Sequence, residues 1–162
     1  MGPLISQRSV DRVQGYIDKG QDEGGRLVLD RRNVRYEKEL PGYFVGPCIF
    51  DGVTPDMTIA REEIFGPVGA FMPVGRLEDA FDRINNLPYG NAASIFTTNG
   101  RSAREFKYHV RAGNLGVNVG VPAPMAFFPF AGMKDSFFGT LHGQGREAID
   151  FFTDRKVVIT RW

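Results

Sequence analysis

The sequence predicts an α/β fold, a largely parallel sheet flanked by helices. Segments with apolar residues at helical spacing alternate with short segments rich in β-formers along 162 residues, a length of about one domain. The 20 glycines and 10 prolines lie mostly between these segments, where they mark turns. Strands that alternate with helices of about ten residues are typical of a parallel sheet with crossover connections.

The helices are predicted from apolar residues three or four positions apart and from the breakers that end each segment. The first carries Val10, Val13 and Ile17 on one face and stops before Gly24. The others follow the same pattern. The predicted helices are Ser9–Glu23, Leu77–Leu87, Ser102–Val110 and His142–Phe152.

The strands are predicted where β-branched and aromatic residues gather between breakers. They are Arg26–Leu29, Tyr43–Phe50, Val68–Val74, Ala92–Thr97, Gly116–Val119 and Lys156–Trp162. The second of these is extended but interrupted by Gly46-Pro47. Loops or turns are expected at Arg31–Pro41, Thr54–Met57 and Pro122–Pro129.

The composition argues against several classes of partner. Lys and Arg number 20 against 19 Asp and Glu, and a net charge of +1 gives no electrostatic basis for binding nucleic acid or an anionic membrane. No apolar run reaches the ~20 residues of a membrane span, and Met1–Val10 lacks the layout of a signal peptide. One cysteine among 162 residues fits a reducing cytoplasm, and with only two histidines we expect no metal site.

The most informative segment is Glu62–Val68 (EEIFGPV), which places acids and an aromatic residue in a Gly-Pro turn before an apolar strand. A carboxylate there can accept hydrogen bonds from ribose hydroxyls, and an adjacent ring can pack against a planar base. Taken alone, Glu63 would be a solvated acid and Phe65 a core residue. We expect Glu62 to be a structural or surface acid.

Four segments in order resemble the aldehyde dehydrogenase superfamily. They are Glu62–Val68, Pro88–Thr97 (PYGNAASIFT), Ala112–Asn118 (AGNLGVN) and Pro129–Gly139 (PFAGMKDSFFG). Three further features look most like its methylmalonate-semialdehyde dehydrogenase branch, which acylates coenzyme A. They are Asn91 after Gly90, the pair Phe137-Phe138, and the ending Val157–Trp162 (VVITRW).

The resemblance implies roles for particular residues in a complete enzyme. Glu63 would contact the ribose next to the nicotinamide of NAD, Phe65 would support the nicotinamide ring, and Phe130 would line the aldehyde pocket. The resemblance also implies that residues 1–154 are part of a catalytic domain and residues 155–162 a C-terminal oligomerisation strand. The family's nucleophilic cysteine segment is absent, so no catalytic residue is assigned and we expect this chain to be inactive alone.

Other chemistry-bearing residues have simpler interpretations. Cys48 lies in an apolar segment without a cationic neighbour, which predicts a small buried side chain. The glycines of Gly113–Gly120 favour a strand with turns at its ends over a phosphate loop, and Asn118 would order the loop that follows. His142 is expected at a helix start and Lys134-Asp135 in a solvated turn.

Two classes of function remain open. The first is part of an NAD-dependent semialdehyde dehydrogenase, which takes an aldehyde or semialdehyde substrate, uses coenzyme A as co-substrate and forms homo-oligomers through the last strand. The second is a free-standing, non-catalytic interaction module that pairs with a partner through that same strand, because a terminal strand has a free edge of unpaired N–H and C=O groups.

Overall fold

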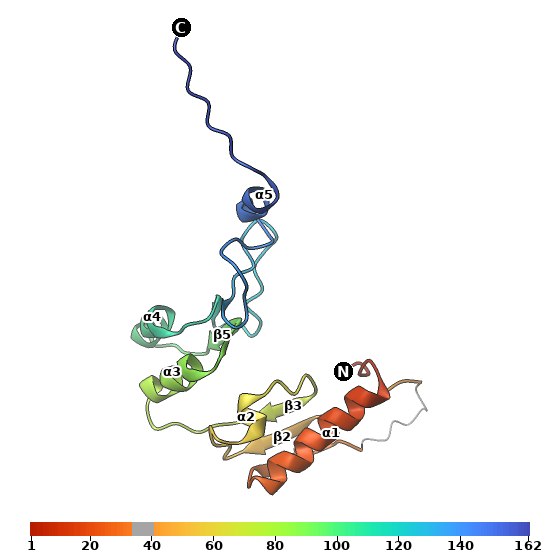
Figure 1. Cartoon of the computed structure of the whole chain (residues 1–162). Helices are drawn as coiled ribbons and strands as arrows, with labels where there is room; N and C mark the ends of the chain where they lie inside the picture. The colour runs from red at the N-terminus through yellow and green to blue at the C-terminus, as the bar shows by residue number, and fades with distance from the viewer. Residues whose placement is uncertain (34–40) are drawn as a thin grey trace. The chain divides into compact units, whose positions relative to one another are not determined.

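The computed structural model describes residues 1–33 and 41–162, so most of the predicted Arg31–Pro41 loop lies outside the described residues (Figure 1). The chain divides into two compact units, Met1–Gly75 and Arg76–Trp162, and each is considered by itself. Helices and small sheets occur in both, which confirms the α/β class. The single, largely parallel sheet is not confirmed, because the described strands form three small sheets with both parallel and antiparallel pairs.

The first unit places two helices beside a three-stranded sheet of order β1-β2-β3. β1 pairs antiparallel with β2, and β2 pairs parallel with β3. Its elements are α1 (Gln7–Asp22), β1 (Arg26–Asp30), β2 (Cys48–Asp51), α2 (Thr58–Arg61) and β3 (Val68–Ala70).

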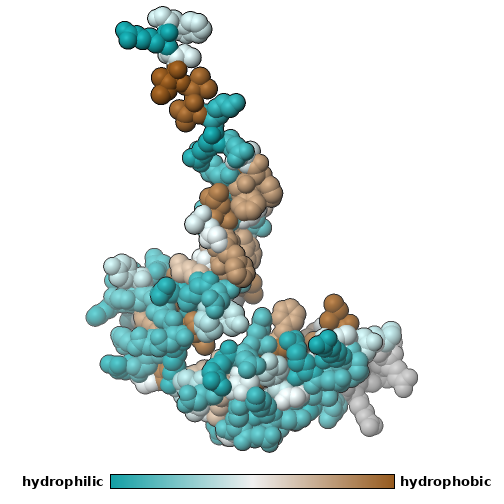
Figure 2. Space-filling view, viewed as in Figure 1, coloured by the Kyte–Doolittle hydropathy of each residue, from teal (hydrophilic) through white to brown (hydrophobic). Residues whose placement is uncertain are grey.

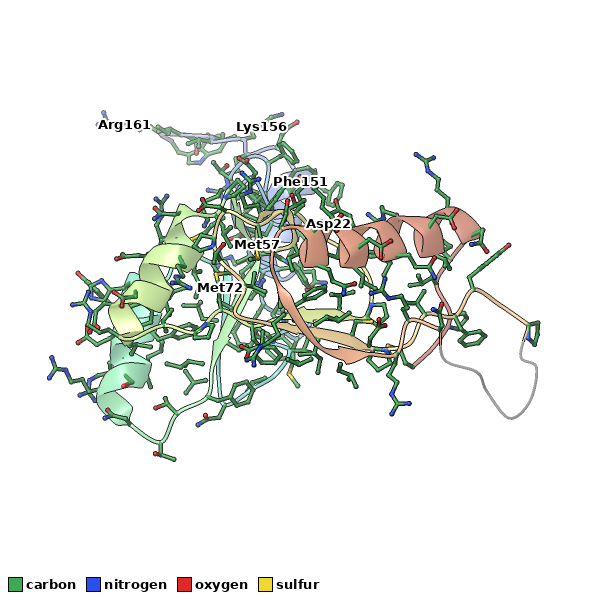
Figure 3. All side chains as sticks on the ribbon, turned by 90° about the horizontal axis from the view of Figure 1, so that it is seen from below. Asp22, Met57, Met72, Phe151, Lys156 and Arg161 are labelled. Atoms are coloured by element: carbon green, nitrogen blue, oxygen red, sulfur yellow. The ribbon has the colours of Figure 1, made fainter. Side chains whose placement is uncertain are left out.

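Helix α1 forms because its sequence supplies both a cap and an apolar face. The Ser6 hydroxyl accepts a hydrogen bond from the Ser9 backbone N–H at 3.2 Å, which satisfies one of the free donors of the first turn. Val13 and Ile17 are fully buried against Phe50 of β2. Met57 belongs to the same buried cluster and Met72 packs against it; both are labelled in Figure 3. The helix predicted at Ser9–Glu23 is confirmed.

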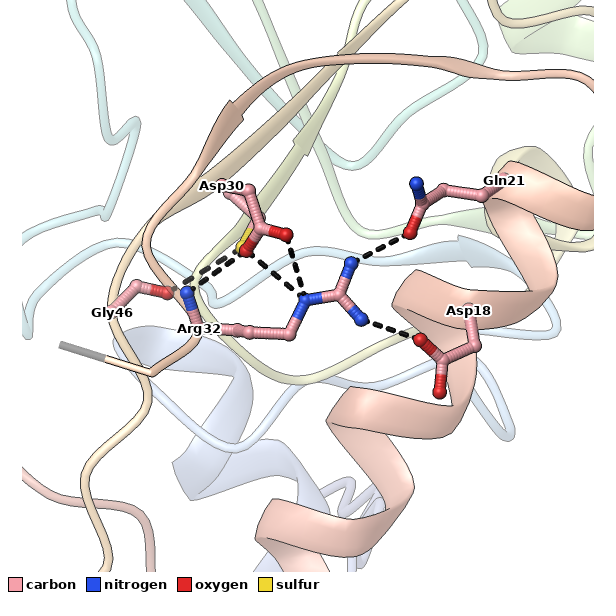
Figure 4. Close-up of polar contacts among 6 residues, drawn as sticks. Asp18, Gln21, Asp30, Arg32 and Gly46 are labelled. Atoms are coloured by element: carbon pink, nitrogen blue, oxygen red, sulfur yellow. Dashed lines mark hydrogen bonds and ion pairs between the residues drawn. The ribbon is translucent and has the colours of Figure 1, made fainter.

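Arg32 ties the end of β1 to helix α1 (Figure 4). Its guanidinium donates to the carboxylate of Asp30 at 3.0 Å and to the Gln21 side-chain oxygen at 2.7 Å, and it also pairs with Asp18. The hydrogen bonds from Arg32 to Asp30 are the main reason that the pKa of Asp30 is lowered. These contacts fix the first strand against the helix.

Helix α2 follows directly after the turn at Thr54–Met57, which the structure confirms, and the sequence did not predict this helix. The short helix starts at Thr58, whose N–H and hydroxyl both donate to the Glu23 carboxylate at 2.6 Å. A helix of four residues is too short to display the 3.6-residue period on which the prediction depends. Its N-terminal cap comes instead from a residue 35 positions earlier in the chain.

The second unit has two helices beside a parallel strand pair, a further two-stranded sheet and a third helix. β5 pairs parallel with β6, and β4 pairs antiparallel with β7. Its elements are α3 (Leu77–Asn86), β4 (Tyr89–Gly90), β5 (Ala92–Ile95), α4 (Gly100–His109), β6 (Asn114–Val117), β7 (Met133–Lys134) and α5 (Arg146–Phe152).

The core of the second unit lies between α3, α4 and the β5–β6 pair. The rings of Phe81 and Phe106 have centroids 6.2 Å apart at a 51° tilt and are both buried. Val110 and Ala112 complete the cluster of buried residues. The Asn99 side chain caps α4 by accepting from the backbone N–H groups of the two residues after Gly100, at 2.8 and 3.1 Å.

The C-terminal segment differs from the prediction in two ways. Helix α5 begins at Arg146, not His142, after Gly145 at φ 65°. Residues 153–162 have neither helix nor strand in the described chain, and Figure 2 shows one strongly hydrophobic cluster on this exposed tail, with hydrophilic side chains on both sides of it. Val157 and Ile159 are 85% and 93% exposed. An oligomerisation strand at residues 155–162 therefore stays a prediction.

No helix among residues 1–33 and 41–162 combines the length and apolar character that crossing a membrane would require.

Candidate functional site

The segment Glu62–Val68 forms a turn between α2 and β3 that packs on the core of the first unit. Ile64 points inward and is buried in the cluster around α1. Gly66 lies so close to α1 that a Cβ at this position would stand 2.5 Å from Cγ2 of Val13. The Pro67 carbonyl accepts from the Cys48 N–H at 2.9 Å and leads the chain into β3. Only glycine allows this approach of the turn to the helix.

Glu63 and Phe65 lie on the outside of the same turn. Both side chains are exposed, Phe65 at 73%, and buried Ile64 stands between them in sequence. Phe65 has φ 54°, a left-handed conformation that is uncommon for a bulky aromatic residue. Such a conformation persists where the surrounding structure fixes it, and it is concentrated at binding and active sites. The turn thus displays an acid and an aromatic ring to solvent together.

The two neighbouring carboxylates of this turn have different environments. An Oε2 of Glu62 accepts a hydrogen bond from the Tyr16 hydroxyl at 2.7 Å. This bond raises the pKa of Tyr16, because it stabilises the neutral hydroxyl as donor. Glu63 makes no hydrogen bond or ion pair within the described part of the chain. Its carboxylate is therefore available to a ligand, while Glu62 is a surface acid that Tyr16 holds, in line with the predicted structural or surface role.

Asn118 closes the open end of the β5–β6 pair in the second unit. Its side-chain oxygen accepts from the Thr97 N–H at 2.8 Å, and its side-chain nitrogen donates to the Thr97 carbonyl at 3.0 Å. Its own N–H donates to the Ile95 carbonyl at 2.8 Å, and its φ is 57°. The residue thereby sets the direction of the loop that follows, as the sequence predicts. The strand expected in Gly113–Gly120 is β6.

Phe130 is 43% exposed and belongs to a segment that packs closely against β6. The buried Asn114 side chain donates to the Ala131 carbonyl at 2.6 Å. A Cβ on Gly113 would stand 2.4 Å from the carbonyl carbon of Ala131 and the nitrogen of Gly132. The backbone next to Phe130 is therefore fixed. Phe130 lies in the second unit and Glu63 and Phe65 in the first, so their common use by one site stays a prediction.

Lys134 is not in a solvated turn, which corrects the prediction. Its ammonium group donates to the carbonyls of Ile84 at 3.0 Å and Leu87 at 2.8 Å, at the C-terminal end of α3. Cations are favourable at this end of a helix. Burial lowers the pKa of Lys134 from its usual value. The sequence carried no local signal for this contact, because the carbonyls lie about 50 residues earlier in the chain.

His142 lies in the loop before α5 and pairs with the first turn of that helix. Its Nδ1 and backbone N–H are 2.5 and 2.8 Å from an oxygen of Glu147, and its ring stacks on Phe137 with centroids 4.1 Å apart. The backbone hydrogen bond, followed by the side-chain bond, lowers the pKa of Glu147. These contacts explain His142 as a structural residue that connects its loop to α5.

Cys48 is buried, with 1% of its surface exposed, and its thiol lies 3.6 Å from a carboxylate oxygen of Asp30. Burial is the main reason that its pKa is raised, which disfavours the reactive thiolate. The small buried residue predicted from the sequence is thus confirmed. Among the residues that the structure describes, no group of three or more His, Cys, Asp or Glu could hold a metal ion.

Comparison of the chain with known protein families identifies the class of protein to which it belongs. The model of the aldehyde dehydrogenase family matches residues 1–158, and the chain belongs to this family. The resemblance inferred from the four sequence segments is confirmed.

Several of the most similar relatives and solved structures are named semialdehyde dehydrogenases. Malonate-semialdehyde dehydrogenase of Bacillus subtilis strain 168 is 49% identical over 163 residues, which cover 100% of this chain and 33% of that protein. A methylmalonate-semialdehyde dehydrogenase structure from Sinorhizobium meliloti 1021, complexed with NAD, superposes with TM-score 0.96 at 39% identity, over 100% of this chain and 33% of that one. The Oceanimonas doudoroffii enzyme gives TM-score 0.96 at 41% identity, over 99% and 33%. The chain thus spans about a third of the length of these relatives.

Proposed function

We propose that this chain is part of an NAD-dependent malonate- or methylmalonate-semialdehyde dehydrogenase and carries the turn that contacts the cofactor. The observation that carries the proposal is the exposed, unpaired carboxylate of Glu63 beside the left-handed Phe65 in one fixed turn. The names and extent of the relatives support the reaction class. The activity belongs to a longer polypeptide, since the chain spans about a third of these proteins.

The residues of the turn fit NAD. Glu63 is a free acceptor for ribose hydroxyls, and charge-assisted hydrogen bonds of this kind are stronger than neutral ones. The exposed face of Phe65 can support a planar nicotinamide ring. When bound, the nicotinamide takes up a hydride from the substrate. Phe130 would line the pocket that holds the aldehyde carbon.

The aldehyde needs a thiolate nucleophile, and the buried Cys48 does not fit that role. We therefore place the nucleophile elsewhere in the longer polypeptide. Oxidation of the semialdehyde leaves an acyl group on that cysteine as a thioester, and the thiol of coenzyme A takes up the acyl group as the cysteine leaves. This chain alone would supply neither thiolate nor turnover. We place the enzyme in the cytoplasm, which the single cysteine of the sequence supports.

The test compares two proteins, the 162-residue chain and a polypeptide of the relatives' length that contains it. Each is mixed with NAD, coenzyme A and malonate or methylmalonate semialdehyde, and NADH absorbance is followed. We expect NADH and acyl-coenzyme A from the longer polypeptide only. Turnover by the short chain that disappears in Cys48→Ser would overturn the proposal.

A second candidate role is interaction through the last residues, either between subunits of the enzyme or in a free-standing binding module. The observation that favours it is the exposed apolar tail, in which Val158 and Trp162 are solvent-accessible. Sedimentation velocity should show concentration-dependent association of the chain, and deletion of Lys156–Trp162 should reduce it. A concentration-independent monomer for the undeleted chain contradicts this role.

A further inference from the structure

We propose that Tyr16 is a positioning residue for the cofactor turn, because its hydroxyl bond to Glu62 fixes the backbone that displays Glu63 and Phe65. This inference rests on the proposed function, since it assigns Tyr16 to the cofactor contact of that same enzyme. All the contacts that carry it lie in the first unit, Met1–Gly75.

Helix α1 holds the short helix α2 at both of its ends. At the start, the Glu23 carboxylate, just after α1, accepts from the Thr58 N–H and hydroxyl at 2.6 Å each. At the end, the Tyr16 hydroxyl donates to Glu62 at 2.7 Å. Tyr16 and Glu62 are 46 residues apart in sequence, so the bond is a tertiary contact. Two such contacts fix a helix that is too short to be stable by itself.

Glu62 makes the second of these contacts and is also the sequence neighbour of Glu63. Its N–H donates to the Thr58 carbonyl at 2.9 Å, which ends α2. Its side chain is then held by Tyr16, whose ring packs partly buried against the core of α1. Fixing both the backbone and the side chain of Glu62 sets the direction in which the chain leaves α2. The next residue along the chain is Glu63, which carries the free carboxylate.

The left-handed conformation of Phe65 is the reason that the turn needs restraints such as the Tyr16–Glu62 hydrogen bond. A left-handed conformation of a bulky residue, such as φ 54° at Phe65, persists only where the surrounding structure fixes it. Gly66 against Val13 fixes the far flank. On the near flank, buried Ile64 fixes position, but only the Tyr16–Glu62 bond restrains the first carboxylate of the turn within the described residues. Loss of the hydroxyl should therefore misplace the cofactor contacts without removing core packing.

The test uses the longer polypeptide with four single variants, together with the Tyr16→Phe/Glu62→Ala double variant and Glu63→Gln. Tyr16→Phe removes only the hydroxyl, Glu62→Ala removes the acceptor, and Glu62→Gln keeps an acceptor oxygen. Tyr108→Phe is the matched control, since Tyr108 is 87% exposed and its hydroxyl makes no bond in the described chain.

We expect Tyr16→Phe and Glu62→Ala each to raise the KM for NAD by about 3- to 10-fold, the effect of losing one typical intramolecular hydrogen bond. The double variant should be no worse than either single one, because both remove the same contact. Glu62→Gln should lie closer to the wild type than Glu62→Ala. The KM for the semialdehyde and the unfolding midpoint should change little in all of them, and Tyr108→Phe should behave as wild type.

An unchanged KM for NAD in Tyr16→Phe, with a raised value in Glu63→Gln, overturns the positioning role of Tyr16 and leaves the proposed function intact. A general loss of stability with equal rises in both KM values also overturns it, because Tyr16 would then only stabilise the fold. If neither Tyr16→Phe nor Glu63→Gln changes the KM for NAD, the proposed function of the turn as a cofactor contact is itself overturned.

Discussion

The substitution Gly66→Ala tests whether the cofactor turn depends on its close approach to α1. The new Cβ would stand 2.5 Å from Cγ2 and 3.0 Å from Cγ1 of Val13, whereas ordinary contacts are 3.4–4 Å. Val13 cannot turn away, because a β-branched residue in a helix has one preferred rotamer and this one is fully buried. The turn cannot easily move either, since Pro67 restricts the conformation of the residue before it.

An overlap of about 1 Å in a packed site typically costs ~1–3 kcal/mol. We expect Gly66→Ala to lower the free energy of unfolding by that amount, which lowers the urea midpoint by about 1 M. Urea denaturation of the chain, followed by circular dichroism, measures this change. The matched control is Gly15→Ala on the exposed face of α1, where a Cβ meets nothing within 4 Å. It should stabilise the helix by about 0.5–1 kcal/mol.

A double variant identifies the cause. Val13→Ala removes both methyl groups that the new Cβ would meet, so Gly66→Ala should cost clearly less in the Val13→Ala background. If Gly66→Ala and Gly15→Ala have the same effect on unfolding, or if Val13→Ala leaves the cost of Gly66→Ala undiminished, the close approach does not hold the turn.

Two further predictions concern the polar contacts that hold short elements in place. Thr58 donates two hydrogen bonds to Glu23 and lowers the pKa of its carboxyl below the usual 4.5. Stability from this contact is present above pH 4.5 and is lost as the pH falls through the folded-state pKa, so Glu23→Gln should flatten the pH dependence of the unfolding midpoint there. An unchanged acid profile would contradict the cap. Lys134→Met should destabilise the chain by about 1–2 kcal/mol in urea denaturation, because it leaves the Leu87 carbonyl without its donor, and Lys134→Arg should retain more stability than Lys134→Met. Equal stability of Lys134→Met and wild type would refute this role.

The sequence predicts elements whose information is local. Helix α1 follows from the spacing of Val13 and Ile17, and the Glu62–Val68 turn follows from Gly66-Pro67 next to acids and an aromatic residue. The left-handed conformation of Phe65 has no local signal, because the contacts around it, not its own preference, determine φ.

The contacts that the sequence did not predict are tertiary. Helix α2 depends on Tyr16 of α1 and on Glu23 directly after α1, and Lys134 caps α3 from about 50 residues away. The two-residue strands β4 and β7 are too short for a period of two to be visible. The separation of the sheet into small sheets follows from pairing partners that periodicity does not specify.

The most direct test of the proposed cofactor turn is NAD binding and turnover by the longer polypeptide with Glu63→Gln beside Glu62→Gln. The first removes the charge of the free carboxylate and keeps its size, while the second keeps an acceptor for Tyr16. Glu63→Gln should lose about 1–3 kcal/mol in kcat/KM for NAD, and Glu62→Gln should lose much less. Wild-type kinetics for Glu63→Gln together with impaired Glu62→Gln would contradict the assignment of Glu63 as the cofactor contact.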